Sequence, residues 1–483
     1  MLDFLAMRAT TSPNALALVA NGQTWTYAQL NADVARLCAY CDGLGIANGE
    51  AVAVLASASP EAVIVIHALT RLGAVLVLLN TRLTVPELAT QVRLAGCHRV
   101  LYSEGFTETA QQLGIMAHPL PAISALPIST TWQNNALPLT QACALVFTSG
   151  TSGTPKAATL TRANFFYSAM ASAYHIGTLP HDRWLCVLPL FHVGGLSIVY
   201  RACLYGITLD LMPKFDAPTL AHYLAQTAVT LISLVPTQVY RLLDVDAPRP
   251  QALRLVLLGG AAANPELVER ARRAGYPIAT TYGLTEACSQ VATALPDVVA
   301  RKSGTVGKPL PFTQVRIVDE RGRDVPQGAS GEIVVTGLTV MAGYYGNPEA
   351  SAHALRDGAL YTGDIGYLDE DGDLWLLQRR SDLIISGGEN IYPYEIEALL
   401  MSHPAVKEAC AVGVPDEEWG QTVAVAVVLK PTDTATPEEL IGFLQGKLAR
   451  YKQPRQLIIV PELPTTASGK VLRGAVRAWF TAN

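Results

Sequence analysis

The sequence predicts an α/β protein with a large amino-terminal domain and a small α+β carboxy-terminal domain. Between Val52 and Thr285, short apolar runs typical of buried strands alternate with helical patterns. This alternation indicates parallel-rich layered sheets with helices on both faces. After Gly304 the strand patterns follow one another without an intervening helix, so we expect a β-rich subdomain there. The remainder of the chain mixes strand patterns with helical ones.

The elements of the first part are expected from their apolar periodicity. Strands are predicted at 51–56, 74–79, 99–103, 144–149, 184–190, 231–236, 253–261 and 277–283, and helices at 60–71, 219–228, 237–244 and 265–275. The most apolar stretch, 62–80, is interrupted by His67, Arg71 and Gly73. We therefore interpret it as a buried helix and strand rather than as a membrane span. Ligands bind at the carboxyl ends of parallel strands, which favours the polar loops after 144–149 and 277–283.

The second part of the chain is expected to be antiparallel at first. Residues 312–337 and 361–393 each suggest strand, turn and strand, with turns at Asp371–Gly372 and at Gly387–Gly388. A later helix is expected to begin after Thr436, because Glu439 completes a capping box; its apolar stripe is Leu440, Phe443, Leu444 and Leu448. We place a domain boundary near Arg380–Ser381, which gives domains 1–380 and 381–483.

Composition narrows the function. The net charge is −5, half of the residues are hydrophobic, and Lys and Arg form no run longer than a pair, so we expect no nucleic-acid partner. The eight cysteines are scattered, and the C-x-x-C of Cys38 and Cys41 has no second pair, so we interpret these two as core residues rather than zinc ligands. The amino terminus shows no signal-peptide pattern. We expect a cytoplasmic protein that acts on small molecules.

The stretch VFTSGTSGTPKAATLTRANF (146–165) follows a predicted strand and is rich in Gly, Ser and Thr. It is not the common phosphate loop, because no Ser or Thr follows Lys156. Gly150 and Gly153 would let the backbone approach a ligand closely, and Lys156 adds a point charge suited to phosphate. A solvated linker of the same composition is the alternative.

Five motifs occur in the order found in one enzyme superfamily. TSGTSGTPK (148–156) resembles the phosphate loop of adenylate-forming enzymes, which include acyl-CoA synthetases, adenylation domains and luciferases. TYGLTE (281–286), YTGDIGYLDEDG (361–372), QRRSDLIISGGENIYPYEIE (378–397) and PTTASGKVLR (464–473) resemble its adenine-and-magnesium, ribose, hinge and lysine motifs. Together they span nearly the whole chain, so the chain is identified as a member of this superfamily.

The resemblance implies a site for ATP and magnesium. The residues expected to hold the pyrophosphate end of ATP are Thr148, Ser149, Gly150, Thr151, Ser152, Gly153, Thr154 and Lys156. Those expected around adenosine and the α-phosphate are Gly260, Ala261, Thr281, Tyr282, Gly283, Thr285, Asp364 and Arg379. Among them Tyr282 would stack on the base, Asp364 would accept hydrogen bonds from both ribose hydroxyls and Arg379 would assist at the ribose. Glu286 would bind magnesium. The alternatives are a buried tyrosine, a turn aspartate and a surface arginine.

The resemblance also implies two half-reactions, in which ATP first activates a carboxylate and CoA then takes the acyl group. Lys470 would stabilise charge during activation, and the catalytic set would comprise Lys470, His192, Thr285 and Glu286. Ser381 aligns with the hinge, where many relatives have Asp or Lys. Ser386, Gly387 and Gly388 would lie beside the thiol arm of CoA after the small domain rotates.

The acid itself is less well indicated. GLTEACSQ and RRSDLIISGGENIYP most resemble the o-succinylbenzoate–CoA ligases of menaquinone biosynthesis. His192 would then line the acyl channel, Arg201 would meet the second carboxylate, and Ser197 and Thr281 would donate neutral hydrogen bonds. A core histidine and a surface arginine on an amphipathic helix are the alternatives.

Three other functions stay open on the sequence alone. One is another aryl- or medium-chain acyl-CoA ligase, and a second is a stand-alone enzyme that loads a carrier protein. A third is a catalytically silent relative. Such a relative would be expected to lack Lys470, Glu286 or Asp364, and all three are present. A homodimer is a family-based expectation.

Overall fold

The computed structural model describes residues 3–128, 137–148, 155–245, 250–260, 263, 265–379, 384–386, 389–391, 393–416, 419–431, 433–445, 447–448, 450–466 and 469–481. By its contacts the chain forms two compact units, each of which is described by itself. The first unit is Met1–Ala263, Leu267–Val315 and Val334–Tyr361, and the second is Asn264–Glu266, Arg316–Ile333 and Thr362–Asn483. The predicted boundary near Arg380–Ser381 lies outside the described residues and stays a prediction.

The larger of two sheets in the first unit is mostly parallel, as predicted. Its nine strands run in the order β15-β14-β13-β12-β11-β9-β10-β1-β2. All neighbours from β13 to β1 pair in parallel, while β14, β15 and β2 are antiparallel edges. The strands are β1 Leu16–Ala20, β2 Gln23–Thr26, β9 Arg183–Cys186, β10 Thr208–Leu211, β11 Leu231–Leu234, β12 Leu255–Leu258, β13 Ile278–Leu284, β14 Ser289–Ala294 and β15 Lys308–Pro309.

The second sheet has six strands in the order β6-β5-β3-β4-β7-β8. Its strands are parallel up to β7, and β8 returns antiparallel to β7. The strands are β3 Ala51–Leu55, β4 Val75–Leu78, β5 Arg99–Tyr102, β6 Met116–Pro119, β7 Ala142–Thr148 and β8 Lys156–Thr161. All residues of β3 and β4 are buried, as expected for near-continuous apolar strands that are covered on both faces.

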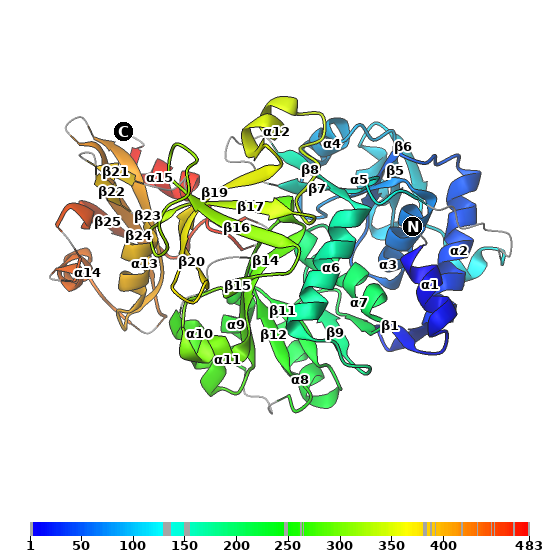
Figure 1. Cartoon of the computed structure of the whole chain (residues 1–483), viewed down its shortest axis with the longest axis horizontal. Helices are drawn as coiled ribbons and strands as arrows, with labels where there is room; N and C mark the ends of the chain where they lie inside the picture. The colour runs from blue at the N-terminus through cyan, green and yellow to red at the C-terminus, as the bar shows by residue number, and fades with distance from the viewer. Residues whose placement is uncertain are drawn as a thin grey trace. The chain divides into compact units, whose positions relative to one another are not determined.

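Helices fill the space between these two sheets (Figure 1). Helix α2 (Tyr27–Gly43) packs on β1 and α7 (Val193–Tyr205) on β9 and β10, whereas α3 (Pro60–Leu72) packs on β4 and α6 (Arg162–Ile176) on β8. Pairs α2–α3 and α6–α7 are also in contact. The outer faces are covered by α8 Ala217–Gln226, α9 Pro236–Leu243, α10 Pro265–Arg273 and α11 Pro296–Arg301 on the first sheet, and by α4 Val85–Leu94 and α5 Thr107–Gln111 on the second.

A third sheet contains the antiparallel strands predicted after Gly304. Its order is β16-β17-β19-β18, and β20 pairs with β19. The strands are β16 Thr313–Val318, β17 Gly331–Gly337, β18 Leu355–Arg356, β19 Ala359–Leu368 and β20 Leu374–Arg379. The chain passes from one unit to the other within β16, β17 and β19. Two further helices of the first unit are α1 Phe4–Thr11 and α12 Pro348–Ala354.

The second unit continues as an α+β structure. Strands β23 (Val406–Asp416), β24 (Gly420–Leu429) and β25 (Gln456–Ile459) form one sheet, and β21 (Ile384–Ser386) pairs with β22 (Glu389–Ile391). Alternate residues of β24 face opposite sides, because side chains in a strand have a period of two. Val423, Val425 and Val427 pack with α13 (Pro393–Met401) and α14 (Pro437–Leu444), while Ala424 and Ala426 pack on the side of α15 (Arg473–Thr481).

Several local predictions are confirmed. The stretch 62–80 forms α3 and β4, with His67 and Arg71 buried in it, and no helix among the described residues is long and apolar enough to cross a bilayer. Thr436 caps α14 through the expected capping box. Cys38 and Cys41 are buried core residues on α2.

Candidate active site

The hairpin of β7 and β8 carries the predicted phosphate loop between its strands. β7 ends at Thr148 and β8 begins at Lys156, and these two residues face each other in the antiparallel register. The Thr148 hydroxyl donates a hydrogen bond to the Lys156 carbonyl oxygen at 3.5 Å. The register therefore fixes where the loop begins and ends. The loop residues Ser149, Gly150, Thr151, Ser152, Gly153 and Thr154 lie outside the described residues.

The carboxyl ends of neighbouring parallel strands meet beside one another, as the strand order requires. Gly259 follows β12, and a Cβ added to it would lie 2.7 Å from the Cγ2 atom of Thr281 on β13. Gly260 has a φ of +80°, a backbone conformation that residues with a side chain rarely adopt. A Cβ at this position would approach Val235, which follows β11. Gly259 and Gly260 thus allow the chain after β12 to pass close to the ends of β11 and β13. Ala261 lies outside the described residues.

The TYGLTE segment turns sharply at the end of β13. A Cβ on Gly283 would lie only 1.9 Å from the carbonyl oxygen of Ser289, so the close return of the chain requires glycine. A short 3₁₀ helix, Thr285–Ala287, follows and holds Thr285 and Glu286 at half-buried positions. Tyr282 is 6% exposed, so its stacking on a base stays a prediction.

Glu286 has a partner that the sequence did not reveal. The hydroxyl of Tyr344 donates to Oε1 of Glu286 at 2.8 Å, across 58 positions of the sequence. The face of the Tyr344 ring lies 5.4 Å from Nζ of Lys156. Carboxylate oxygen is the ligand type that magnesium prefers, so a half-buried carboxylate with a neutral donor beside it fits that ion. The motif GYYGNPE gives a turn signal but no clue to this pairing.

Helix α7 carries the residues predicted for the acyl group. His192 is half-buried and immediately precedes the helix, and its ring lies 4.7 Å from that of Phe191. A Cβ on Gly195 would lie 2.3 Å from the Pro189 carbonyl oxygen, so the first turn needs glycine to pack against the chain after β9. Ser197 is buried and donates to the Gly194 carbonyl oxygen at 3.2 Å.

Arg201 lies two-thirds of the way along α7 and is 2% exposed. The alternative of a surface arginine is therefore wrong. Its Nη2 donates to the Ser168 hydroxyl at 3.3 Å, and its guanidinium carbon lies 5.7 Å from the Trp184 ring. Burial raises the pKa of the neighbouring Tyr205 and Cys288 and lowers the pKa of Arg201. No carboxylate of the described residues forms an ion pair with it, and its Nε has no hydrogen-bond partner there.

The predicted ribose residues belong to the second unit. Asp364 on β19 is 6% exposed and pairs in register with Arg379 on β20. The backbone N–H of Asp364 donates to the Thr362 hydroxyl, and the N–H of Gly363 donates to Glu332. The antiparallel register thus brings the two predicted ribose residues to opposite positions, fifteen residues apart along the chain.

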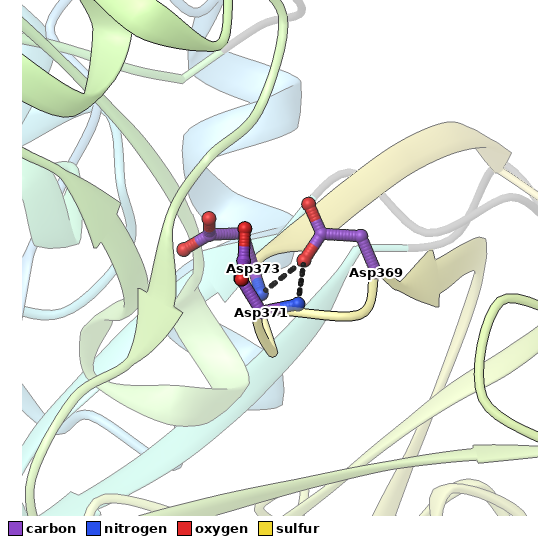
Figure 2. A group of neighbouring side chains, drawn as sticks. All are labelled: Asp369, Asp371 and Asp373. Atoms are coloured by element: carbon purple, nitrogen blue, oxygen red, sulfur yellow. Dashed lines mark hydrogen bonds between the residues drawn. The ribbon is translucent and has the colours of Figure 1, made fainter.

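The turn that sets this register is built on one carboxylate. Oδ1 of Asp369 accepts hydrogen bonds from the backbone N–H groups of Asp371 and Asp373 at 3.0 and 2.9 Å (Figure 2). Oδ2 accepts from the indole N–H of Trp375 at 2.9 Å. The three aspartates could together approach a cation, but the Asp369 carboxylate is already engaged in holding the hairpin. The turn predicted at Asp371–Gly372 is confirmed.

Lys470 is exposed in a narrow loop before α15. Thr465 and Val471 form a β-bridge, and the backbone N–H of Lys470 donates to the Thr466 hydroxyl at 3.2 Å. Three residues later, Arg473 makes a bidentate ion pair with the buried Glu397 of α13, with Nη2 and Oε2 2.9 Å apart. The loop is therefore fixed to the unit's core at its carboxyl end.

The residues predicted to contact the thiol arm are only partly described. Ser386 ends β21, is 8% exposed, and pairs with Glu389 of β22. Gly387, Gly388 and the hinge residue Ser381 lie outside the described residues, as does the side chain of Arg379. The geometry therefore places Lys470 and Ser386 in one unit and leaves their predicted roles as predictions.

Two family models match the chain. Residues 5–345 match the model of the AMP-binding enzymes, and residues 395–470 match that of the AMP-binding enzyme C-terminal domain. The 2-succinylbenzoate–CoA ligase of Bacillus mycoides (strain KBAB4) is 41% identical over 479 residues, which cover 99% of this chain and 98% of that protein.

Solved structures of a CoA synthetase and of an amide bond synthetase also superimpose on this chain. The o-succinylbenzoate CoA synthetase of Bacillus subtilis in complex with its acyl-adenylate intermediate superimposes with a TM-score of 0.93 at 36% identity, covering 99% of this chain and 98% of that one. The same enzyme with ATP and magnesium gives 0.92 at 36% identity, over 98% and 99%. An amide bond synthetase from Marinactinospora thermotolerans gives a TM-score of 0.92 at 29% identity, over 99% of each chain.

Proposed function

This chain belongs to the family of AMP-binding enzymes, and from that premise we propose that it is an ATP-dependent o-succinylbenzoate–CoA ligase. In the first half-reaction a carboxylate oxygen of the acid attacks the α-phosphorus of ATP and pyrophosphate leaves. In the second, the sulfur of CoA attacks the acyl carbon and AMP leaves. Activation is needed because a free carboxylate is a poor electrophile. The proposal is supported by 41% sequence identity to 2-succinylbenzoate–CoA ligases over 99% of this chain.

The residues divide between positioning the nucleotide and stabilising charge. Thr148 and Lys156 stand at the two ends of the loop that would hold the pyrophosphate end, and Thr285 would bind the α-phosphate. Glu286 would hold magnesium, which neutralises charge on the phosphates when it is bound. Lys470 would place a positive charge where negative charge builds during activation, the kind of preorganised electrostatic effect that lowers such barriers most.

Arg201 is the observation that carries the choice of acid. Burial of a guanidinium without an anion costs free energy, and folded proteins normally pair a buried charge with an opposite one. Here the described surroundings supply a hydroxyl and an aromatic face but no carboxylate. An acid with a second carboxylate would complete the pair, directly or through a water molecule. A monocarboxylic fatty acid would leave the charge unsatisfied.

The domain behaviour and cellular setting follow from the same proposal. The part after Ser381 would rotate between the half-reactions, withdrawing Lys470 and presenting Ser386, Gly387 and Gly388 to CoA. Hinges need only a few residues that absorb the backbone change, so serine can serve there. We also propose that the enzyme acts in the cytoplasm, where ATP and CoA are available, and that it forms a homodimer.

A pyrophosphate-release assay over a panel of acids, with and without CoA, tests the function. We expect o-succinylbenzoate to exceed simple benzoates and medium-chain fatty acids by at least about 100-fold in kcat/KM, because a site built for a polar group rejects analogues lacking it. Formation of the thioester should require CoA. Equal turnover of monocarboxylic acids would overturn the choice of acid, and transfer only to a carrier protein would overturn the choice of acceptor.

A further inference from the structure

Tyr344 lies between two charged residues that come from separate parts of the first unit. Its hydroxyl donates to Oε1 of Glu286 at 2.8 Å, and its ring faces Nζ of Lys156 at 5.4 Å. Lys156 begins β8, Glu286 lies in the 3₁₀ turn after β13, and Tyr344 lies in the segment before α12. One side chain therefore connects the end of the predicted phosphate loop with the predicted metal carboxylate.

The backbone of Tyr344 is held from both sides. Tyr344 forms an isolated antiparallel β-bridge with Ala158 on β8, and the backbone N–H of Tyr344 donates to the Ser351 hydroxyl at 2.9 Å. The Ser351 hydroxyl in turn donates to the carbonyl oxygen of Asn347 at 2.7 Å. These contacts fix the backbone position from which the Tyr344 side chain reaches Glu286.

The carboxylate is anchored by the same segment. The N–H of Met341 donates to the backbone carbonyl oxygen of Glu286 at 2.8 Å. Residues 341–344 thus hold both the backbone and the side chain of Glu286. An ionised carboxylate offers about four lone-pair positions, so the bond from Tyr344 to Oε1 leaves Oε2 and further sites available to a cation.

We propose that Tyr344 is a positioning residue for the metal and phosphate groups of the site. Its hydroxyl fixes the orientation of the Glu286 carboxylate toward magnesium, and the electron-rich face of its ring favours the position of the Lys156 ammonium. This inference rests on the proposed function only in taking Glu286 as the metal ligand. Its effect on chemistry would act through Glu286 and Lys156, not through contact with the reacting atoms.

Two substitutions separate the two roles. Tyr344→Phe removes the hydroxyl and keeps the ring, and Tyr344→Leu removes both. Tyr345→Phe is the matched control, because Tyr345 is the next residue, is 45% exposed, and has its hydroxyl near Gly96 instead. Tyr344→Phe changes no buried volume beyond one oxygen atom, so it remains decisive even if Tyr344→Leu fails to fold.

The readout is metal binding without turnover. Mn²⁺ replaces magnesium and is titrated by electron paramagnetic resonance in the presence of a non-hydrolysable ATP analogue and without acid. We expect Tyr344→Phe to weaken Mn²⁺ binding about 10-fold, as loss of outer-shell partners of metal ligands does. The affinity for the nucleotide in EDTA should stay unchanged in Tyr344→Phe and fall about threefold in Tyr344→Leu. Tyr345→Phe should match the unmodified protein in both titrations.

Failure of the inference and failure of the proposed function give different results. If Glu286→Gln weakens Mn²⁺ binding but Tyr344→Phe does not, Tyr344 has no positioning role and the ligase proposal stands. If neither variant changes Mn²⁺ binding, Glu286 is not a ligand and the inference falls with that assignment. A protein that binds Mn²⁺ and nucleotide as expected, yet releases no pyrophosphate with any acid, would refute the ligase proposal alone.

Discussion

Arg201 in the first unit and Arg473 in the second both donate hydrogen bonds to other parts of the protein, but their surroundings differ. The guanidinium of Arg473 has a bidentate carboxylate, Glu397, and also donates to the carbonyl oxygen of Ala411 at 2.7 Å. That of Arg201 meets a hydroxyl and an aromatic ring within the described part of the chain, and no acidic side chain. Arg201 is also the more deeply buried of the two, with 2% of its surface exposed, whereas the Arg473 side chain retains 24%.

From this difference we expect Arg473 to be a structural cation and Arg201 to await an anion. A paired buried arginine contributes to the fold, since removing it leaves its carboxylate without compensation. An unpaired one costs stability in the free protein and is retained for what it binds. The same substitution should therefore lower the free energy of unfolding at Arg473 and leave it unchanged or raise it at Arg201. Four experiments test the roles of these two arginines and of the residues beside them.

The largest effect is expected at Lys470, which lies on the loop that Arg473 anchors. Lys470→Ala should lower acyl-adenylate formation at least about 1,000-fold, because it removes the charge that we propose stabilises the activation step. The conversion of a supplied acyl-adenylate and CoA to thioester should be nearly unchanged. Separate assays of the two half-reactions measure this, and an equal loss in both would contradict the division of roles.

The next effect concerns Arg201, which has no acidic partner within the described part of the chain. Arg201→Met keeps the volume and removes the charge, so kcat/KM for o-succinylbenzoate should fall about 300-fold, or roughly 3.4 kcal/mol. Turnover of an analogue without the second carboxylate should change less than about threefold. The free energy of unfolding should stay the same or rise by about 1 kcal/mol. A parallel loss with both acids would show that Arg201 supports the fold of the site and does not recognise the carboxylate.

Arg473→Met provides the opposite case. Denaturant unfolding should show a loss of about 3 kcal/mol, because Glu397 stays buried beside Ala411 without its cation. Adding Glu397→Leu should recover most of that loss, since a well-packed apolar pair can replace a buried ion pair. A single variant as stable as the original protein would show that the pair adds nothing, and the contrast with Arg201 would disappear.

The smallest effect is expected at Ser168, which accepts from Arg201 and donates to the Cys288 carbonyl oxygen at 2.6 Å. Ser168→Ala should reduce kcat/KM for the diacid about fivefold, the cost of about 1 kcal/mol for one hydrogen bond. Ser172, one turn further along α6 and equally buried, gives the control variant Ser172→Ala, which should keep full preference for the diacid. Equal effects of the two variants would show that Ser168 does not orient Arg201.

Much of the fold could be predicted because its signals are local. The alternation of apolar runs and helical patterns marked β3, α3, β4 and the parallel strands β9, β11, β12 and β13, although it missed β10, and Thr436 with Glu439 marked the start of α14. The carboxyl-end rule then indicated where the loops of the site gather. Such features depend on residues a few positions apart, which one sequence displays directly.

The contacts that complete the site could not be predicted in this way. Tyr344 reaches Glu286 across 58 positions, and Arg473 reaches Glu397 across 76. Both pairs depend on how elements far apart in the sequence pack together, which no local pattern contains. The burial of Arg201 was equally hidden, because most residues of α7 are buried and the helix has no single polar side.

Helix α7 has a further consequence for how this enzyme could acquire a new substrate. It packs on β9 and β10 of one sheet, while the Tyr200 hydroxyl beside Arg201 reaches Thr70 of α3 at 2.7 Å and Cys143 of β7 at 3.4 Å. The residues proposed to choose the acid are thus part of the interior that joins both sheets. Retargeting by directed evolution would accordingly start from a stabilised parent, because mutations that reshape this helix also disturb the packing around it.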